Sequence, residues 1–227
     1  MKTVAMIVAA GRGLRFGGDV PKQFRKIMDR PLLTWTAMQF EEAEGIDEIV
    51  LVVSEDFLLY ANEEVVNPYR FSKLTRIVKG GETREESVFN GLKSLPISTG
   101  YVAIHDGARP VVSIGDINRV VKAAQKDRAA ILARPVSDTV KRVEADFIIS
   151  TLDRTKLYLA ETPQVFQYDL IMTAHEKYSR SDKVTDDAYM VELLGFKVKI
   201  VVSESANLKV TTEEDLHLAN LLLKDRT

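Results

Sequence analysis

Short runs of apolar residues alternate with segments of helical spacing along most of this 227-residue chain, and this alternation limits the fold more than any other feature. Runs rich in Val and Ile predict strands at 3–9, 48–54, 75–80, 101–106, 129–136 and 197–203. Helical spacing predicts helices at 31–43, 57–66, 84–94, 114–127, 168–179 and 186–194, with a last helix starting near Thr211. We therefore expect an α/β fold with a Rossmann-like, mostly parallel sheet that is flanked by helices. Ligands of such sheets bind at the carboxyl ends of the strands.

The alternation stops at residues 137–164, where polar and apolar residues alternate and no helix separates two extended halves. The residues "EAD" (144–146) predict a turn, so we expect a β-hairpin that protrudes from the sheet. An isolated hairpin is marginally stable in water, and "FIIS" (147–150) and "LYLA" (157–160) are apolar. We expect one domain over residues 1–227, with a β-arm at about 137–160 that is buried against a second copy of the chain.

Charge and composition exclude several classes of partner. Lys and Arg number 31 against 33 Asp and Glu, so the surface as a whole is not that of a nucleic-acid or anionic-membrane binder. The chain has no cysteine, which excludes disulfides and thiolate metal sites. The apolar run before the first glycine is too short for a signal peptide, and no segment reaches the ~20 apolar residues of a membrane span. We expect a cytoplasmic protein without membrane or nucleic-acid partners.

A glycine-rich stretch, "AAGRGLRFGGDVPKQF" (9–24), follows the first predicted strand and opens a local cluster of basic residues. Backbone N–H groups beside glycines can approach phosphate oxygens closely, and Arg and Lys add positive charge there. The stretch predicts a phosphate-binding loop. It is not a dinucleotide fingerprint, because Phe16 stands where the third glycine belongs, and it lacks the Gly-Lys-Ser/Thr of a P-loop.

The glycine stretch resembles the signature loop of the sugar-phosphate nucleotidyltransferases. Together with "GGETREESVFNGL", "HDGARP", "DTVKR", "LDR", "ETPQVF", "TDDA" and "NLKVT", it makes the chain similar to the 2-C-methyl-D-erythritol 4-phosphate cytidylyltransferase family from residue 5 to about residue 220. The resemblance implies a Mg²⁺-dependent reaction of CTP with a sugar-alcohol phosphate in non-mevalonate isoprenoid biosynthesis. Pyrophosphate would be released, and the β-arm would join a homodimer.

The resemblance also implies roles for individual residues. In this reaction a phosphate oxygen that is already anionic attacks the α-phosphorus of CTP, so the site needs fixed positive charge rather than a strong base. Arg15 and Lys22 would be the catalytic residues that supply it. The nucleotide-binding residues would be Ala9, Ala10, Gly11, Gly13, Gly81, Glu82 and Ser87.

The acceptor side of the site would be built from later stretches. Asp106, at the end of a predicted strand, would be the Mg²⁺ ligand and would also contact substrate. The other substrate-binding residues would be Arg109, Thr139, Arg154, Thr162, Thr185 and Lys209, with Arg154 completing the partner's site. Taken singly, such residues are more often surface or capping residues, and Thr185 before two aspartates has the pattern of an N-cap.

Three other functions have to be weighed. A ribitol-5-phosphate cytidylyltransferase would share the fold and the reaction, but we expect "AGG" there in place of Ala9, Ala10 and Gly11, and a bulkier residue within "HDGARP". A nicotinamide-dependent oxidoreductase is disfavoured by Phe16. A nucleotide-binding protein without catalysis would be expected to have lost Arg15 or Lys22, and both are present.

Overall fold

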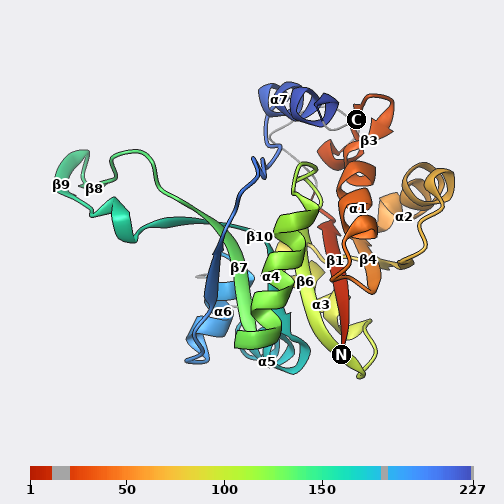
Figure 1. The fold of residues 1–227 in the computed structure, drawn as a ribbon, viewed down its shortest axis with the longest axis horizontal. Helices are drawn as coiled ribbons and strands as arrows, with labels where there is room; N and C mark the ends of the chain where they lie inside the picture. Colours follow the sequence, from red (N-terminus) through yellow and green to blue (C-terminus); the bar gives the residue numbers. More distant parts are fainter. Residues whose placement is uncertain (12–20, 180–183, 226–227) are drawn as a thin grey trace.

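A seven-stranded sheet forms the centre of the computed structural model, which describes residues 1–11, 21–179 and 184–225 (Figure 1). The strand order is β11-β7-β10-β6-β1-β4-β5, and β10 alone among these strands runs antiparallel to its neighbours. The mostly parallel sheet predicted from the sequence is confirmed. Its strands are β1 (Lys2–Ala9), β4 (Glu48–Val53), β5 (Leu74–Lys79), β6 (Thr99–Asp106), β7 (Ala129–Pro135), β10 (Tyr158–Gln167) and β11 (Lys199–Val202).

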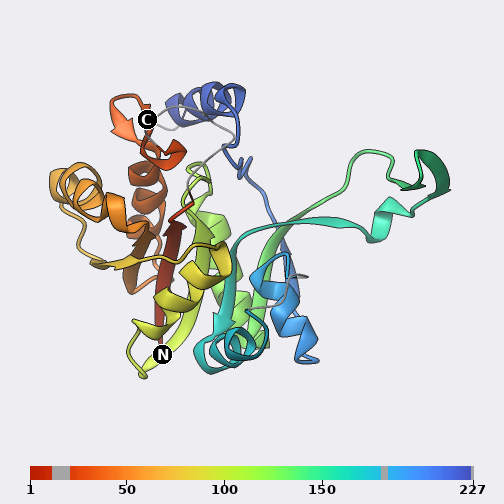
Figure 2. The same cartoon turned by 180° about the vertical axis from the view of Figure 1, so that it is seen from behind.

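Helices cover both faces of the sheet (Figures 1 and 2). The residues of β1 alternate between the two faces: Ala5 and Ile7 pack with α1 and α4, and Val4 and Met6 pack with α3, α5 and α6. This alternation of buried residues is what a strand covered on both sides requires. The five helices are α1 (Leu32–Glu42), α4 (Ile114–Asp127), α3 (Arg84–Lys93), α5 (Tyr168–Tyr178) and α6 (Asp187–Leu193).

Two of the predicted helices differ from the structure in detail. Residues 57–66 do not form one α-helix: a short α2 (Leu58–Tyr60) leads into a wider π-helical turn (Ala61–Val66). The last helix, predicted to start near Thr211, is α7 (Glu213–Lys224); its N-cap is Thr212, which forms a capping box with Asp215.

The hairpin is shorter than the sequence predicted. Strands β8 (Lys141–Glu144) and β9 (Phe147–Thr151) pair with each other, and the turn lies at Ala145 and Asp146, both with positive φ. Residues 158–164, predicted as part of the hairpin's second half, instead belong to β10 of the central sheet. Pro163 and the buried polar residues of "ETPQ" hid this strand in the sequence pattern.

The arm carries apolar side chains into solvent. In Figures 1 and 2 it extends well beyond the body of the protein. Phe147 is 75% exposed and Ile148 65% exposed, values that are unusual for large apolar residues. Other exposed apolar residues of the arm and its stem are Val143, Ile149, Leu152, Tyr158 and Leu159.

The connections of the sheet place a crevice beside β1. The chain runs from β1 through α1 to β4 and then to β5, and afterwards returns to the other side of β1 as β6. The connection after β1 therefore runs toward one edge of the sheet and the connection after β6 toward the other, so the strand order reverses between these two adjacent strands. Such a switch point is where open α/β sheets bind ligands, and Gly107 N donates to Val8 O at 2.8 Å there.

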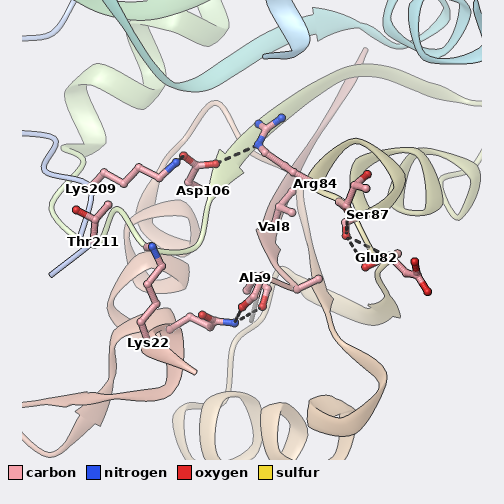
Figure 3. A pocket seen from close by; sticks show the side chains of 15 residues that line it. Val8, Ala9, Lys22, Glu82, Arg84, Ser87, Asp106, Lys209 and Thr211 are labelled. Atoms are coloured by element: carbon pink, nitrogen blue, oxygen red, sulfur yellow. Dashed lines mark hydrogen bonds and ion pairs between the residues drawn. The ribbon is translucent and has the colours of Figure 1, made fainter. Parts of the chain in front are cut away.

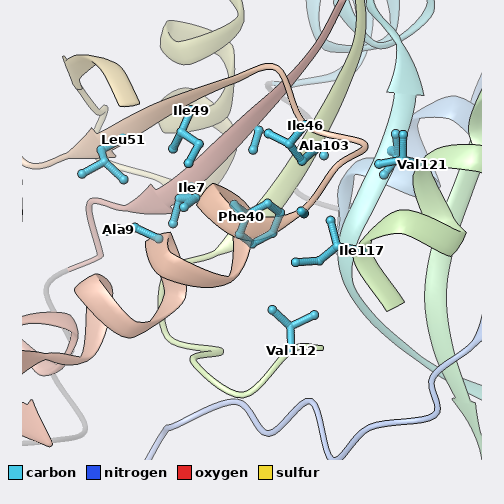
Figure 4. Packing of buried hydrophobic residues seen from close by; sticks show 14 of the residues in the cluster. Ile7, Ala9, Phe40, Ile46, Ile49, Leu51, Ala103, Val112, Ile117 and Val121 are labelled. Atoms are coloured by element: carbon cyan, nitrogen blue, oxygen red, sulfur yellow. The ribbon is translucent and has the colours of Figure 1, made fainter. Parts of the chain in front are cut away.

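Phe40 on α1 anchors the core on one face of the sheet (Figure 4). It is fully buried among residues such as Ile7, Ile46 and Ile117, and its ring centroid lies 4.8 Å from that of His105. Because His105 precedes Asp106 at the end of β6, this packing also supports the crevice.

We expect Phe40→Ala to lower the free energy of unfolding by about 3–5 kcal/mol, because it removes a buried ring and leaves a cavity. Urea titrations followed by circular dichroism measure the change. Ile97→Ala is the control, since Ile97 is 93% exposed, and its curve should overlay that of the parent. Equal stabilities for both variants would contradict this account of the core.

Candidate active site

Two cavities adjoin at the carboxyl ends of β1 and β6. The larger has a volume of about 580 Å³ and the smaller of about 280 Å³. Arg84, Asp106 and Lys209 line both, so these three side chains form the boundary between them. The arrangement provides room for two ligands side by side with one set of charges between them.

The backbone after β1 forms one wall of the larger cavity. Gln23 is buried beneath it, and its Nε2 donates to Ala9 O at 2.6 Å and to Gly11 O at 2.9 Å. These bonds fix the course of the chain where the glycine stretch begins. Lys22 comes from the short helical turn Lys22–Phe24, and its Nζ donates to Val210 O at 2.8 Å.

The loop before α3 forms the opposite wall. Ser87 Oγ accepts from Gly81 N at 3.0 Å and donates to Thr83 O at 2.8 Å, so a buried hydroxyl ties the loop to the helix. Position 80 requires glycine because its backbone passes close to Ala10: a Cβ at position 80 would lie 2.4 Å from the Cβ of Ala10. Glu82 lies at the rim of this cavity, with its backbone N–H donating to Glu86 Oε2 at 2.9 Å.

Asp106 ends β6 and lies close to three cations, of which Figure 3 shows Lys209 and Arg84. Lys209 Nζ lies 2.8 Å from Asp106 Oδ2, Arg84 Nε lies 3.4 Å from Oδ1, and Arg109 Nε lies 3.5 Å from Oδ2. Burial alone would raise the pKa of Asp106, but these cations outweigh it and hold the pKa far below its ordinary range. The carboxylate is therefore ionised at neutral pH.

A second carboxylate holds Arg84 from behind. Asp187, the first residue of α6, lies fully buried with Oδ2 2.7 Å from Arg84 Nη2. Its other oxygen, Oδ1, lies 3.0 Å from Nε2 of the buried His175. Burial would raise the pKa of Asp187, but Arg84 and His175 lower it to about 2.

The smaller cavity is bordered by polar residues of β10 and of the loop after β6. Thr162 Oγ1 accepts from the backbone N–H of Asp106 at 3.1 Å and contacts His105 Nδ1 at 3.1 Å. Arg109 Nη1 donates to Asn207 O at 2.7 Å. Burial lowers the pKa of His105 to about 3, so its imidazole is neutral, and its Nε2 contacts Arg109 O at 3.2 Å.

Comparison with known proteins identifies the family. The family model described as 2-C-methyl-D-erythritol 4-phosphate cytidylyltransferase (IspD) matches residues 3–225. A protein of that name from Pelotomaculum thermopropionicum is 45% identical over 99% of this chain and 95% of its own length. The chain belongs to the IspD family.

Solved structures agree with this assignment. The crystal structure of 4-diphosphocytidyl-2C-methyl-D-erythritol synthase from Anaerococcus prevotii is 35% identical, with a TM-score of 0.86 and 98% of both chains covered. The 2-C-methyl-D-erythritol 4-phosphate cytidylyltransferase from Thermus thermophilus has a TM-score of 0.78 at 32% identity, covering 99% of this chain and 100% of that one. The fold predicted from the sequence is thus that of the family.

Most of the site residues predicted from the sequence lie at the two cavities, while Thr139 and Arg154 lie on the exposed arm and line neither. Arg154 donates a hydrogen bond to the carbonyl of Ser137 within the arm. Gly13 and Arg15 fall outside the described residues. The larger cavity is lined by Ala9, Ala10, Gly11, Lys22, Gly81, Glu82 and Ser87, the smaller by Arg109, Thr162 and Thr185, and both by Asp106 and Lys209.

Sequence reasoning missed Arg84 as a site residue. It is the first residue of α3, where a positive side chain opposes the helix dipole, and this misfit was a usable signal. Thr185 is not the N-cap of α6, because Asp186 takes that position. Other lining residues that were missed are Gln23, Thr83, Thr211, Glu161, Gln164 and Asp186, whose side chains are typical of ordinary caps and surface positions.

The acid dependence of stability tests the environment of Asp187. Because its folded pKa is lowered from 3.8 to about 2, its ionisation stabilises the fold above pH 4 and this contribution is lost as the pH falls toward 2. We expect Asp187→Asn to be less stable than the parent by on the order of 2 kcal/mol at pH 6. Urea titrations should find a smaller difference at pH 3. A difference that stays constant between the two pH values would contradict the lowered pKa.

Proposed function

We propose that this protein is a cytidylyltransferase that joins CTP and 2-C-methyl-D-erythritol 4-phosphate to give 4-diphosphocytidyl-2-C-methyl-D-erythritol and pyrophosphate. The observation that carries the proposal is the pair of adjoining cavities with shared charges, in a chain of the IspD family. The larger cavity would take the nucleotide, since it joins the phosphate-binding backbone after β1 to the loop at Gly81, Glu82 and Ser87. The smaller cavity would take the sugar-alcohol phosphate.

The reaction moves a cytidylyl group without a covalent intermediate on the protein. A phosphate oxygen of the acceptor forms a bond to the α-phosphorus of CTP, and the bond from that phosphorus to the pyrophosphate oxygen breaks. Two anions must therefore approach each other, which is the main electrostatic obstacle. Lys22 on the nucleotide side and Lys209 and Arg84 at the boundary stabilise the charge, and Arg109 holds the acceptor phosphate.

A magnesium ion fits the donor set, although no group of three acidic or histidine side chains within the described part of the chain is arranged to hold a metal. Mg²⁺ is often bound by one or two carboxylates together with substrate phosphates and water. The ionised Asp106 at the boundary offers one such carboxylate and would hold the ion. Bound there with CTP, Mg²⁺ would neutralise phosphate charge.

The arm supports a homodimer in which each chain completes the other's site. The exposed side chains of Phe147 and Ile148 would be buried against the partner. Each Å² of apolar surface buried in this way stabilises the dimer by about 25 cal/mol. Thr139 and Arg154 lie outside both cavities of their own chain, consistent with a role in the partner's acceptor site.

No helix in the described ranges is long and apolar enough to cross a membrane. The cytoplasm is the location that we propose.

The substrate assignment is tested by incubating the purified protein with CTP, Mg²⁺ and one of two acceptors. We expect pyrophosphate release to be far faster with methylerythritol phosphate than with ribitol 5-phosphate. A reversed preference would favour ribitol-5-phosphate cytidylyltransferase and leave the reaction class intact. Binding of CTP without turnover of either acceptor would favour the nucleotide-binding protein without catalysis.

The action of the arm across the dimer is tested by mixing two variants. Lys22→Ala and Arg154→Ala should each be nearly inactive, since each removes a charge that the substrates need. If Arg154 serves the partner's site, a mixed dimer has one site with both defects and one with neither. Random re-association makes about half of the dimers mixed, so roughly a quarter of all sites should be active.

The control for this experiment is Lys26→Ala, a lysine near Lys22 that instead forms an exposed ion pair with Glu64 at 3.6 Å. It should keep the parent's activity both alone and in mixtures. If heterodimers form between the two inactive variants and activity does not return, Arg154 does not act across the interface.

A further inference from the structure

Asp187 is a fully buried carboxylate that lines neither cavity, yet it contacts a residue that lines both. Its Oδ2 lies 2.7 Å from Arg84 Nη2, while Nε of the same guanidinium lies 3.4 Å from Asp106. Arg84 is therefore held between two carboxylates: that of Asp187, which is buried away from the cavities, and that of Asp106, which lies at their boundary. The sequence "TDDA" gives its two aspartates different tasks, since Asp186 caps α6 and Asp187 reaches Arg84.

Arg84 needs such an anchor because its own helix does not favour it. It occupies the first turn of α3, where the helix dipole repels a cation. A long, flexible side chain in that position would turn toward solvent unless carboxylates held it. Arg84 lines both cavities, while its Nη1 is buried and has no hydrogen-bond partner among the described residues.

His175 fixes the anchor in turn. Its Nε2 lies 3.0 Å from Asp187 Oδ1, and because a carboxylate only accepts, Nε2 carries the proton and donates. The ring is fully buried and lies parallel to that of Phe89, with 6.2 Å between the centroids. The two oxygens of the Asp187 carboxylate thus accept from different partners, Oδ1 from His175 on α5 and Oδ2 from Arg84. The bond to His175 therefore fixes the orientation of the carboxylate that holds Arg84.

We propose that Asp187 and His175 are positioning residues of the transfer reaction, which act by holding the Arg84 guanidinium at the boundary of the two cavities. The chain of contacts runs from α5 through α6 to α3 and ends at Asp106. This inference rests on the proposed function, because Arg84 is held where the two phosphate-bearing substrates would meet. Misplacing such a group by about 1 Å can cost on the order of a hundredfold in rate.

The first experiment measures kcat, and the affinity and stoichiometry of CTP binding, for Asp187→Asn. We expect kcat to fall by on the order of tenfold or more, with one CTP still bound per chain by calorimetry. Asp127→Asn on the exposed end of α4 is the matched control and should keep the parent's kcat. The parent is assayed first, so failure of the proposed function is seen there and is distinct from failure of this inference. A kcat for Asp187→Asn equal to that of the parent would overturn the inference.

The second experiment is a double-mutant cycle with Arg84→Met. If Asp187 acts through Arg84, adding Asp187→Asn to Arg84→Met should lower kcat by less than about twofold. If the same large loss recurs in that background, Asp187 acts independently of Arg84 and the inference is wrong. A merely structural role predicts this second result, since lost stability would lower activity in either background.

The third experiment changes His175 and keeps Asp187 and Arg84 intact, so it decides the question even if Asp187→Asn does not fold. His175→Gln keeps a side-chain N–H donor, whereas His175→Phe keeps a ring and loses the donor. We expect kcat per bound CTP to stay within about threefold of the parent for Gln and to fall by about fivefold or more for Phe. Equal kcat values for the two variants would overturn the proposal.

Discussion

The ion pairs of Asp106 with Lys209, Arg84 and Arg109 are the interaction on which the site depends. The carboxylate sits at the end of β6, and its three partners come from the loop after β11, from the start of α3 and from the loop after β6. A single buried charge thus ties together segments that are far apart in the sequence. Removing one partner from such a cluster leaves a buried charge less compensated, which costs more than the loss of a surface pair.

This cluster also explains how one sheet can bring two anions together. Parallel strands place the loops after β1 and β6 side by side at the switch point, and the cavities open there. The side chains of Arg84 and Lys209 line both cavities, so their positive charges lie beside both ligand sites. Asp187 and His175 lie buried behind these cations: Asp187 contacts Arg84, and His175 contacts Asp187.

Much of this arrangement could be predicted from the sequence, and for physical reasons. Buried parallel strands carry continuous Val and Ile runs, so β1, β4 and β6 were found together with Asp106 at a strand end. β10 was not, because Pro163 and the buried Glu161 and Gln164 depart from that pattern. Arg84 and Asp187 were missed because their place in the site depends on a contact between residues far apart in the sequence, and such a contact leaves no periodic pattern. For Gly13 and Arg15, which lie outside the described residues, the predicted roles stay predictions.

The central claim is that both substrates depend on the same boundary cations, and Lys209→Met tests it most directly. Lys209 lines both cavities and lies 2.8 Å from Asp106, so its charge would act on both ligands at once. Steady-state kinetics with each substrate varied in turn should find a higher KM for CTP, a higher KM for methylerythritol phosphate and a lower kcat. A change in KM for one substrate alone, with kcat intact, would contradict a shared boundary.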